Sequence, residues 1–271
     1  MAKVYYVGDW AVLTGPVFAE TPFHHSPKGL DIFNYGVWLK EALEAGGEHE
    51  VASVSAWDFY NKLGPGAYEA ILDQYDVFIF SDVDAKLFQL APSFFDRKEF
   101  GQRVLTFPDR IRLTIDAVHA GKSVMFLGGW YSFTGELGKG GWGRTRLREI
   151  LPLVCLETED LVESTEGYTA RATKRGQSLF RGIDLASIPP VLGYNKTLPA
   201  PGGEVLAIWR ETGDPMLALG RYGKGRSLAY TSDPAPHWGC NFIYWDRYGA
   251  FWRRCLELVL DRSAAPRSKR S

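Results

Sequence analysis

The stretch GKSVMFLGGWYSFTG, residues 121–135, joins a short apolar run to a glycine-rich turn. A short apolar run between turn signals is typical of a strand that is covered on both faces of a parallel sheet. Many α/β enzymes keep a nucleophile at the turn that follows such a strand. This turn begins with Gly128, Gly129 and Trp130, so neither a cysteine nor a serine stands at its apex.

Strand and helix patterns alternate before this stretch, and such alternation predicts right-handed crossovers and a mostly parallel sheet with helices on both faces. The strands are expected at 3–7, 49–58, 75–83 and 123–127, and the helices at 32–47, 67–74 and 107–122. Between the first strand and the first helix, residues 11–31 are rich in Pro, Gly and His. This segment is too long for an ordinary connection, so we interpret it as a candidate binding loop.

The last third of the chain predicts antiparallel strands added to the sheet, because turn signals at Gly213-Asp214 and at 223–225 divide its apolar runs. A helix-like pattern is expected at 144–153, and an amphipathic helix at 244–261 closes the fold. We therefore expect one α/β domain over residues 1–262 and a disordered tail over 263–271.

Composition argues against several classes of function. The chain has 271 residues and a formal charge of -1, without a long basic run, which disfavours a nucleic-acid or membrane partner. Its three cysteines are scattered, which disfavours disulfides and structural zinc and favours a reducing cytoplasm. No apolar stretch approaches the roughly 20 residues of a membrane helix.

Ligands of open parallel sheets bind beyond the carboxyl ends of the strands. We therefore expect the polar and aromatic residues that follow the apolar runs to converge on one crevice. The candidate ligand-binding residues are Asp9, Trp10, His25, Lys28, Asp82, Asp84, Gly128, Gly129, Trp130, Tyr131 and Trp238. Flat rings beside carboxylates and glycines are usual around small polar ligands, although the same rings also suit packing or an oligomer interface.

Two segments carry a family resemblance: GGWYSFTG at 128–135 and TSDPAPHWG at 231–239, with VGDW at 7–10 and HHSPKGLD at 24–31 as weaker cues. Together with the order of elements, they resemble the class I glutamine amidotransferase-like superfamily, and most of all its bacterial branch described as "putative glutamine amidotransferase". The resemblance implies a flavodoxin-like three-layer sandwich. It also implies a cysteine at the turn, a His-Pro-Glu stretch after a late strand, and backbone amides that stabilise an oxyanion.

The chain departs from that pattern in two places. Gly128 or Gly129 stands where the thiol belongs, and a glycine cannot attack an amide carbon. Asp233-Pro234 stands where His-Pro would be, with His237 three residues beyond the proline. Hydrolysis of glutamine through a thioester is therefore not expected. The two glycines instead suggest an oxyanion nest of backbone N–H groups.

The candidate catalytic residues are His237, Asp233 and Ser132, with Cys240 beside His237 as an alternative nucleophile. We predict no cofactor; a divalent metal on Asp9, His24 or His25, Asp82, Asp84 and His237 is an alternative that no ligand spacing supports.

Three functions remain open from the sequence. The first is binding or hydrolysis of a small polar molecule. The second is a non-catalytic subunit whose aromatic loops form a homo-oligomeric or partner interface. The third, implied by the shared superfamily and the aromatic lining, is a carbohydrate-processing activity like that of trehalose-utilisation proteins. A homo-oligomer is expected in each case.

Overall fold

The computed structural model describes residues 1–18, 25–63, 66–90 and 108–260, and for residues 13–18 and 25–31 it describes the backbone alone. The domain boundary expected at 262 and the tail lie outside the described residues. One eight-stranded sheet runs through the described part, in the order β4-β1-β5-β6-β14-β13-β12-β9. The bounds are β1 Ala2–Gly8, β4 His49–Val54, β5 Val77–Ser81, β6 Ser123–Leu127, β9 Ala170–Ala172, β12 Gly203–Trp209, β13 Pro215–Tyr222 and β14 Gly225–Tyr230.

The sheet divides into a parallel and an antiparallel part. Strands β4, β1, β5, β6 and β14 pair in parallel, and β13, β12 and β9 follow as antiparallel strands. The predicted mostly parallel sheet with antiparallel additions near the C-terminus is therefore confirmed. Strand β14 returns to the parallel part beside β6, and this return brings the segment after Tyr230 next to the Gly128 turn.

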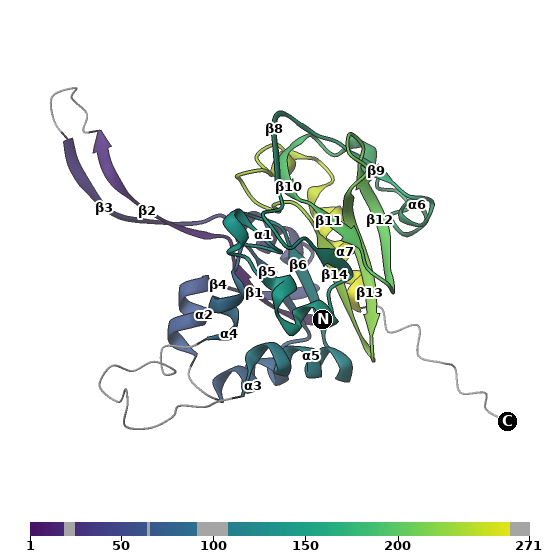
Figure 1. Ribbon diagram of the computed structural model, residues 1–271, viewed down its shortest axis with the longest axis horizontal. Coiled ribbons are helices and arrows are strands. Elements are labelled where there is room, and N and C mark those ends of the chain that lie inside the picture. Colours follow the sequence, from purple (N-terminus) through teal and green to yellow (C-terminus); the bar gives the residue numbers. More distant parts are fainter. Residues whose placement is uncertain (19–24, 64–65, 91–107, 261–271) are drawn as a thin grey trace.

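Two hydrophobic cores cover the two faces of the sheet, because successive side chains of a strand point to opposite sides. In β5, Val77 and Ile79 lie in the core shared with α1 (Val37–Glu44) and α7 (Tyr248–Leu260). Phe78 and Phe80 lie in the other core, which α2 (Ala56–Lys62), α3 (Ala67–Gln74), α4 (Ala85–Gln89) and α5 (Arg110–Ala120) cover. This arrangement is the flavodoxin-like three-layer sandwich that was expected (Figure 1).

The segment expected as a binding loop at 11–31 is instead largely a β-hairpin. Strands β2 (Trp10–Phe18) and β3 (His25–Asn34) pair antiparallel, with Trp10 opposite Asn34. In Figure 1 this hairpin extends away from the body of the molecule. The Pro and Gly residues suggested a loop. However, both strands of a two-stranded ribbon are edge strands, and edge strands tolerate Pro and Gly because one side of each strand makes no ladder hydrogen bonds.

Two other expectations need correction. The second strand ends at Val54, short of 58, because the Ser55 side chain accepts the Asp58 N–H and caps α2. The helix expected at 144–153 is only a pair of 3₁₀ turns, η3 (Trp142–Arg144) and η4 (Arg146–Glu149). Pro152 disfavours a helical conformation for the residue before it, so the pattern does not develop into an α-helix.

Short two-stranded pairings complete the fold beside the sheet. Strand β8 (Leu161–Tyr168) pairs with β10 (Val191–Asn195), and β7 (Leu153–Cys155) pairs with β11 (Thr197–Pro199). Helix α6 (Lys174–Leu179) and the 3₁₀ turns η2 (Glu136–Gly138), η5 (Leu185–Ser187) and η6 (Phe242–Tyr244) lie in the connections. The first pair supplies Glu163 and Asn195 to the edge of the sheet where β6 ends.

Candidate functional site

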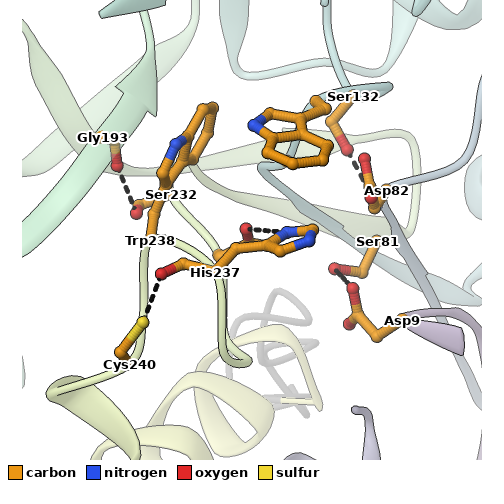
Figure 2. Close-up of polar contacts among 12 residues, drawn as sticks. Asp9, Ser81, Asp82, Ser132, Gly193, Ser232, His237, Trp238 and Cys240 are labelled. Carbon is orange, nitrogen blue, oxygen red and sulfur yellow. Dashed lines mark hydrogen bonds and ion pairs between the residues drawn. The ribbon is translucent and has the colours of Figure 1, made fainter. Parts of the chain in front are cut away.

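The carboxyl ends of β1, β5, β6 and β14 meet at one edge of the sheet, as the sequence predicted. The Ser81 hydroxyl donates to Asp9 Oδ1 at 3.0 Å, and the Tyr131 N–H donates to Asp82 Oδ1 at 2.6 Å. Gly128 donates its N–H to the Ser232 carbonyl at 3.1 Å. These bonds tie the four strand ends together, and Figure 2 shows the one between Ser81 and Asp9.

Backbone strain is concentrated at this edge. Asp9, Asp82 and His237 have φ angles of 52°, 51° and 132°, a region that residues with a side chain seldom occupy. Such conformations persist only where the surrounding structure fixes them, and they gather at functional sites. Hydrogen bonds hold these side chains: Asp9 accepts from Ser81, Asp82 accepts from the Tyr131 N–H, and His237 pairs with Asp233 of its own loop.

The three aspartates of the site have raised pKa values. Burial, followed by the nearby Asp233 carboxylate, raises the pKa of Asp9 well above its ordinary value, although the Tyr6 hydroxyl donates to Asp9. The same two causes raise the pKa of Asp82 to about 7. Burial also raises the pKa of Asp233. Like charges close together in a poorly solvated place disfavour full ionisation, which is why the pKa values of all three carboxyl groups are raised.

His237 is held between a carboxylate and an indole ring. Its Nδ1 lies 3.2 Å from Asp233 Oδ2, and its ring stacks on Trp130 with 4.3 Å between the centroids and 23° between the planes. The hydrogen bond with Asp233 raises the pKa of His237 above its usual value, because the carboxylate favours the imidazolium. Figure 2 shows the His237 ring pointing from its loop toward Asp9 and Asp82.

A cavity of about 650 Å³ opens beside this imidazole. Trp130, His237 and Trp238 form its walls together with Glu163 and Leu192. Glu163 Oε1 accepts the indole N–H of Trp238 at 2.8 Å and that of Trp130 at 3.4 Å. One carboxylate therefore orients both rings, and the cavity combines flat apolar faces with an acid and an imidazole.

The glycine turn does not form the predicted oxyanion nest. Gly128 donates its N–H to the carbonyls of Tyr230 and Ser232, and Gly129 donates to Asn195 Oδ1 at 2.9 Å. Strand β6 leads into turns and the short η2 and not into an α-helix, so no helix N-terminus faces a ligand there. The expected role of Gly128 and Gly129 was wrong because both N–H groups bind the protein itself.

The two glycines are needed for close packing. A Cβ on Gly128 would lie 2.5 Å from the Thr231 carbonyl oxygen, and one on Gly129, whose φ is +146°, would lie 2.7 Å from Asp82 Oδ1. Backbone atoms crowd position 128, so it has no room for a cysteine side chain. At this turn, β6 is therefore in close contact with the segment after β14 and with Asp82.

Asn195 and Asp160 fix the turn from the other side. Asn195 Nδ2 donates to the Gly129 carbonyl at 3.1 Å and to Asp160 Oδ1 at 2.9 Å. Asp160 also accepts the N–H groups of Thr134 and Gly135, each at 2.9 Å. Both side chains are buried, and their bonds make the turn a rigid wall of the site.

Known proteins share the fold described above. A family model described as "Putative glutamine amidotransferase" (GATase1_like) matches residues 19–261. The chain belongs to this family. A cytoplasmic protein from Salmonella typhimurium LT2 shares 28% identity with it at a TM-score of 0.79, covering 95% of this chain and 99% of its own. A second cytoplasmic protein from Salmonella typhimurium shares 25% identity at a TM-score of 0.80, covering 94% and 98%.

Other comparisons add little. A ThuA-like protein from Parabacteroides merdae aligns at 12% identity and a TM-score of 0.48, covering 96% of this chain and 89% of its own, which is too distant to carry an argument. A search of curated proteins gave no match. Every helix among the described residues is too short or too polar to cross a membrane.

Within the family fold, Ser132 has a structural position. Its buried hydroxyl donates to the Leu127 carbonyl at 2.6 Å and accepts the Asp82 N–H at 3.0 Å. These bonds engage the hydroxyl away from His237, so the predicted nucleophilic role is not supported. The alternative nucleophile Cys240 has its thiol directed at the His237 carbonyl and not at the imidazole.

Several predicted ligand-binding residues lie away from the His237 cavity. The Trp10 indole donates to Ser53 Oγ at 3.1 Å and packs edge-on against Trp57, and Asp84 caps α4 by accepting the Lys86 and Leu87 N–H groups. Tyr131 lines a different cavity. The backbones of His25 and Lys28 lie in β3, and their side chains are outside the described residues.

The predicted residues that do come together are Asp9, Asp82, Trp130, Asp233, His237 and Trp238. Sequence analysis missed Glu163 and Asn195, which follow no strand end of the main sheet and carry no motif. Among the described residues, no group of three or more His, Cys, Asp or Glu side chains is arranged to hold a metal ion. The site is thus a set of acid and base groups around an aromatic cavity.

Proposed function

We propose that this chain binds a small, hydroxyl-bearing polar molecule in the cavity between Trp130 and Trp238, and that His237 exchanges a proton with it. The observation that carries the proposal is the placement of the His237 imidazole between Asp233 and Trp130 at the wall of that cavity. Flat indole faces beside a carboxylate and hydroxyl side chains suit a sugar-like ligand. Ser164 and Thr165 add hydroxyl groups to the lining.

The titration behaviour of the site supports a role in proton transfer. The hydrogen bond to Asp233 raises the pKa of His237 and so favours the imidazolium, which is the form that donates a proton. Burial and Asp233 raise the pKa of Asp82 to about 7, so this carboxyl can take up or release a proton near neutral pH. General acid–base chemistry requires one group that donates a proton and one that accepts it.

Glutamine hydrolysis through a thioester does not fit this member of the family. The thiol position of the turn is occupied by Gly128 and Gly129, and a Cβ there meets neighbouring atoms at 2.5 and 2.7 Å. We expect no ammonia release from glutamine above the level of a His237→Ala variant. Ammonia release that depends on His237 would contradict this part of the proposal.

Ligand binding is the direct test. We expect thermal-shift screening against glutamine, monosaccharides and polyols to identify a stabilising hydroxyl-bearing compound, and calorimetry to show at least tenfold weaker binding for Trp130→Ala and His237→Ala. Trp57→Leu serves as the matched control, because this ring packs against Trp10 and is absent from the cavity lining. Equal affinity in all four proteins would overturn the proposal.

A second candidate function rests on the projecting hairpin. Val12, Ile32 and Phe33 are 42%, 57% and 42% exposed near the base of β2 and β3, and an isolated two-stranded ribbon is marginally stable in water. We propose a homo-oligomer in which a second copy covers these residues. Light scattering of Ile32→Ser/Phe33→Ser is expected to give a smaller mass than the parent protein; an unchanged mass would exclude this surface. That this protein processes carbohydrates and that it is cytoplasmic remain predictions from the sequence.

A further inference from the structure

A second cavity, of about 540 Å³, lies on the other side of the Gly128–Gly135 turn. Its walls come from α4 and from the Gly-rich segment 137–145, which no part of the proposed function uses. The Ala85 N–H donates to the Gly140 carbonyl at 2.8 Å and joins these two segments. Tyr131 lines this cavity, whereas its neighbour Trp130 lines the His237 cavity.

Three cationic side chains line this second cavity: Lys86, Lys139 and Arg144. The lining contains one carboxylate, Asp84, and its Oδ1 accepts the backbone N–H groups at the start of α4. The described lining therefore carries a net positive charge. A concave surface of one sign of charge concentrates ligands of the opposite sign.

The geometry holds the Arg144 guanidinium in place. Its Nη2 donates to the Glu157 carbonyl at 2.9 Å, and the same atom lies 3.4 Å from where a Cβ on Gly138 would stand. Gly138 and Gly141 have φ angles of +72° and +64°, which glycine adopts freely. The segment can therefore fold closely against Arg144. Guanidinium has five N–H donors, so a single bond to a carbonyl leaves donors for an anion.

Lys139 is positioned for an added anion as well. Its Nζ lies 3.9 Å from Glu136 Oε2, a distance longer than a hydrogen bond, and 5.8 Å from the centroid of the Tyr131 ring. Such an exposed pair contributes little and yields readily to a multiply charged ligand.

We propose that this cavity binds the phosphate group of a small molecule through Lys86, Lys139 and Arg144. Guanidinium and ammonium groups together are the usual protein partners of phosphate oxygens. The volume falls in the range of pockets for whole small molecules, which favours a phosphate monoester over the free ion. The two cavities share no lining residue, so the phosphate site stands or falls separately from the His237 site.

Calorimetry at low ionic strength with inorganic phosphate, glucose 6-phosphate and glucose tests the proposal. We expect saturable binding of both phosphates and none of glucose at this site, with glucose 6-phosphate binding more tightly than the free ion. Tighter binding of inorganic phosphate would still support the site and would assign it to the free ion. Absence of saturable binding of either phosphate would overturn the proposal.

The variant Lys139→Ala/Arg144→Ala is expected to weaken phosphate binding at least tenfold. Arg171→Ala/Lys174→Ala is the matched control, because it removes the same charge from exposed residues of β9 and α6 outside the cavity lining. Equal weakening in both double variants would show that the effect comes from the loss of positive charge in general and not from this cavity, and it would overturn the proposal. If circular dichroism shows that the cavity variant does not fold, Lys86→Ala, at an exposed residue, replaces it as the test. We expect Lys86→Ala to weaken phosphate binding at least threefold, and an unchanged affinity would contradict the site.

Discussion

Trp130 and Tyr131 are neighbours in the chain but line different cavities, and the two sides of their turn differ in how charge is placed. On the Trp130 side, Asp9 and Asp233 are buried and His237 is half-buried, with pKa values shifted by burial and mutual proximity. On the Tyr131 side, the cations are exposed at the ends of long side chains. The first arrangement suits proton exchange, and the second suits attraction of an anion.

The turn can keep the two cavities distinct because it is rigid. Its glycines pack against the backbone after β14 and against Asp82, and Asn195 and Asp160 hold its N–H and carbonyl groups from the opposite side. A rigid wall keeps the indole and the phenol in fixed places. The difference between the two cavities therefore depends on residues that line neither of them.

Breaking the turn itself should have the largest effect. We expect Gly128→Cys to lower the free energy of unfolding by about 3 kcal/mol or more, because its Cβ would overlap the Thr231 backbone. Urea denaturation gives the measurement, and the introduced thiol should give no glutaminase activity.

Gly182→Ala is the control for this substitution. Unlike Gly128, Gly182 has a positive φ, of 88°, but a Cβ there would meet nothing within 4 Å. The free energy of unfolding of Gly182→Ala should fall only by the roughly 1–2 kcal/mol that the left-handed conformation costs a residue with a Cβ. Equal losses in the two variants would mean that packing of the turn against β14 contributes no stability of its own.

Removing the side chain that grips the turn should have the next largest effect. We expect Asn195→Ala to cost about 2–3 kcal/mol, because it leaves the buried Gly129 N–H without its acceptor and removes a donor from Asp160. Binding in both cavities should weaken together. Asn241→Ala, which removes an exposed amide, is the control. Loss of binding in one cavity alone would show that the turn does not act as a common wall.

Much of this architecture could be predicted from the sequence, since apolar runs and helical periods report burial directly. The runs at 75–83 and 123–127 led to strands β5 and β6, although β5 is shorter than predicted, and the rule that ligands bind beyond parallel strand ends placed Asp9, Asp82 and Asp233 together. The hairpin of β2 and β3 was missed because its Pro and Gly residues carry turn signals within paired strands.

The finer contacts could not be predicted, because they depend on where backbone groups point. The Gly128 and Gly129 N–H groups looked free for an anion, and only tertiary structure shows that Tyr230, Ser232 and Asn195 accept them. The Ser132 hydroxyl was assigned to catalysis by proximity in the sequence, yet it bonds to Leu127. Likewise Glu163 enters the site from a separate two-stranded pair that no motif marks.

The raised pKa of Asp82 predicts that stability depends on pH. Burial and Asp233 raise the pKa of Asp82 to about 7, so folding opposes its ionisation, and stability from this group is lost as pH rises from its ordinary pKa, about 4, to about 7. We expect Asp82→Asn to gain about 2–3 kcal/mol of unfolding free energy relative to the parent protein as pH rises from about 5 to about 8, because about two pH units of this interval lie between the ordinary and the raised pKa of Asp82. Urea denaturation at both pH values measures it. Asp246→Asn, which replaces an exposed carboxylate, should show no such gain. If the free energy of unfolding of both variants fell with rising pH as much as that of the parent protein, the assignment to Asp82 would be contradicted.

The smallest expected effect concerns the stacked pair that defines this side of the turn. An imidazolium over an indole gains about 0.5–1 kcal/mol, so Trp130→Leu should lower the pKa of His237 by about half a pH unit. The hydrogen bond to Asp233 persists in this variant, so the pKa should remain above its usual value. Tyr35→Leu, whose ring lies farther away with 6.2 Å between centroids, should have a smaller effect in the same NMR titration. A pKa that rises in Trp130→Leu would show that the indole mainly desolvates the imidazole, and proton exchange at His237 would then depend on Asp233 alone.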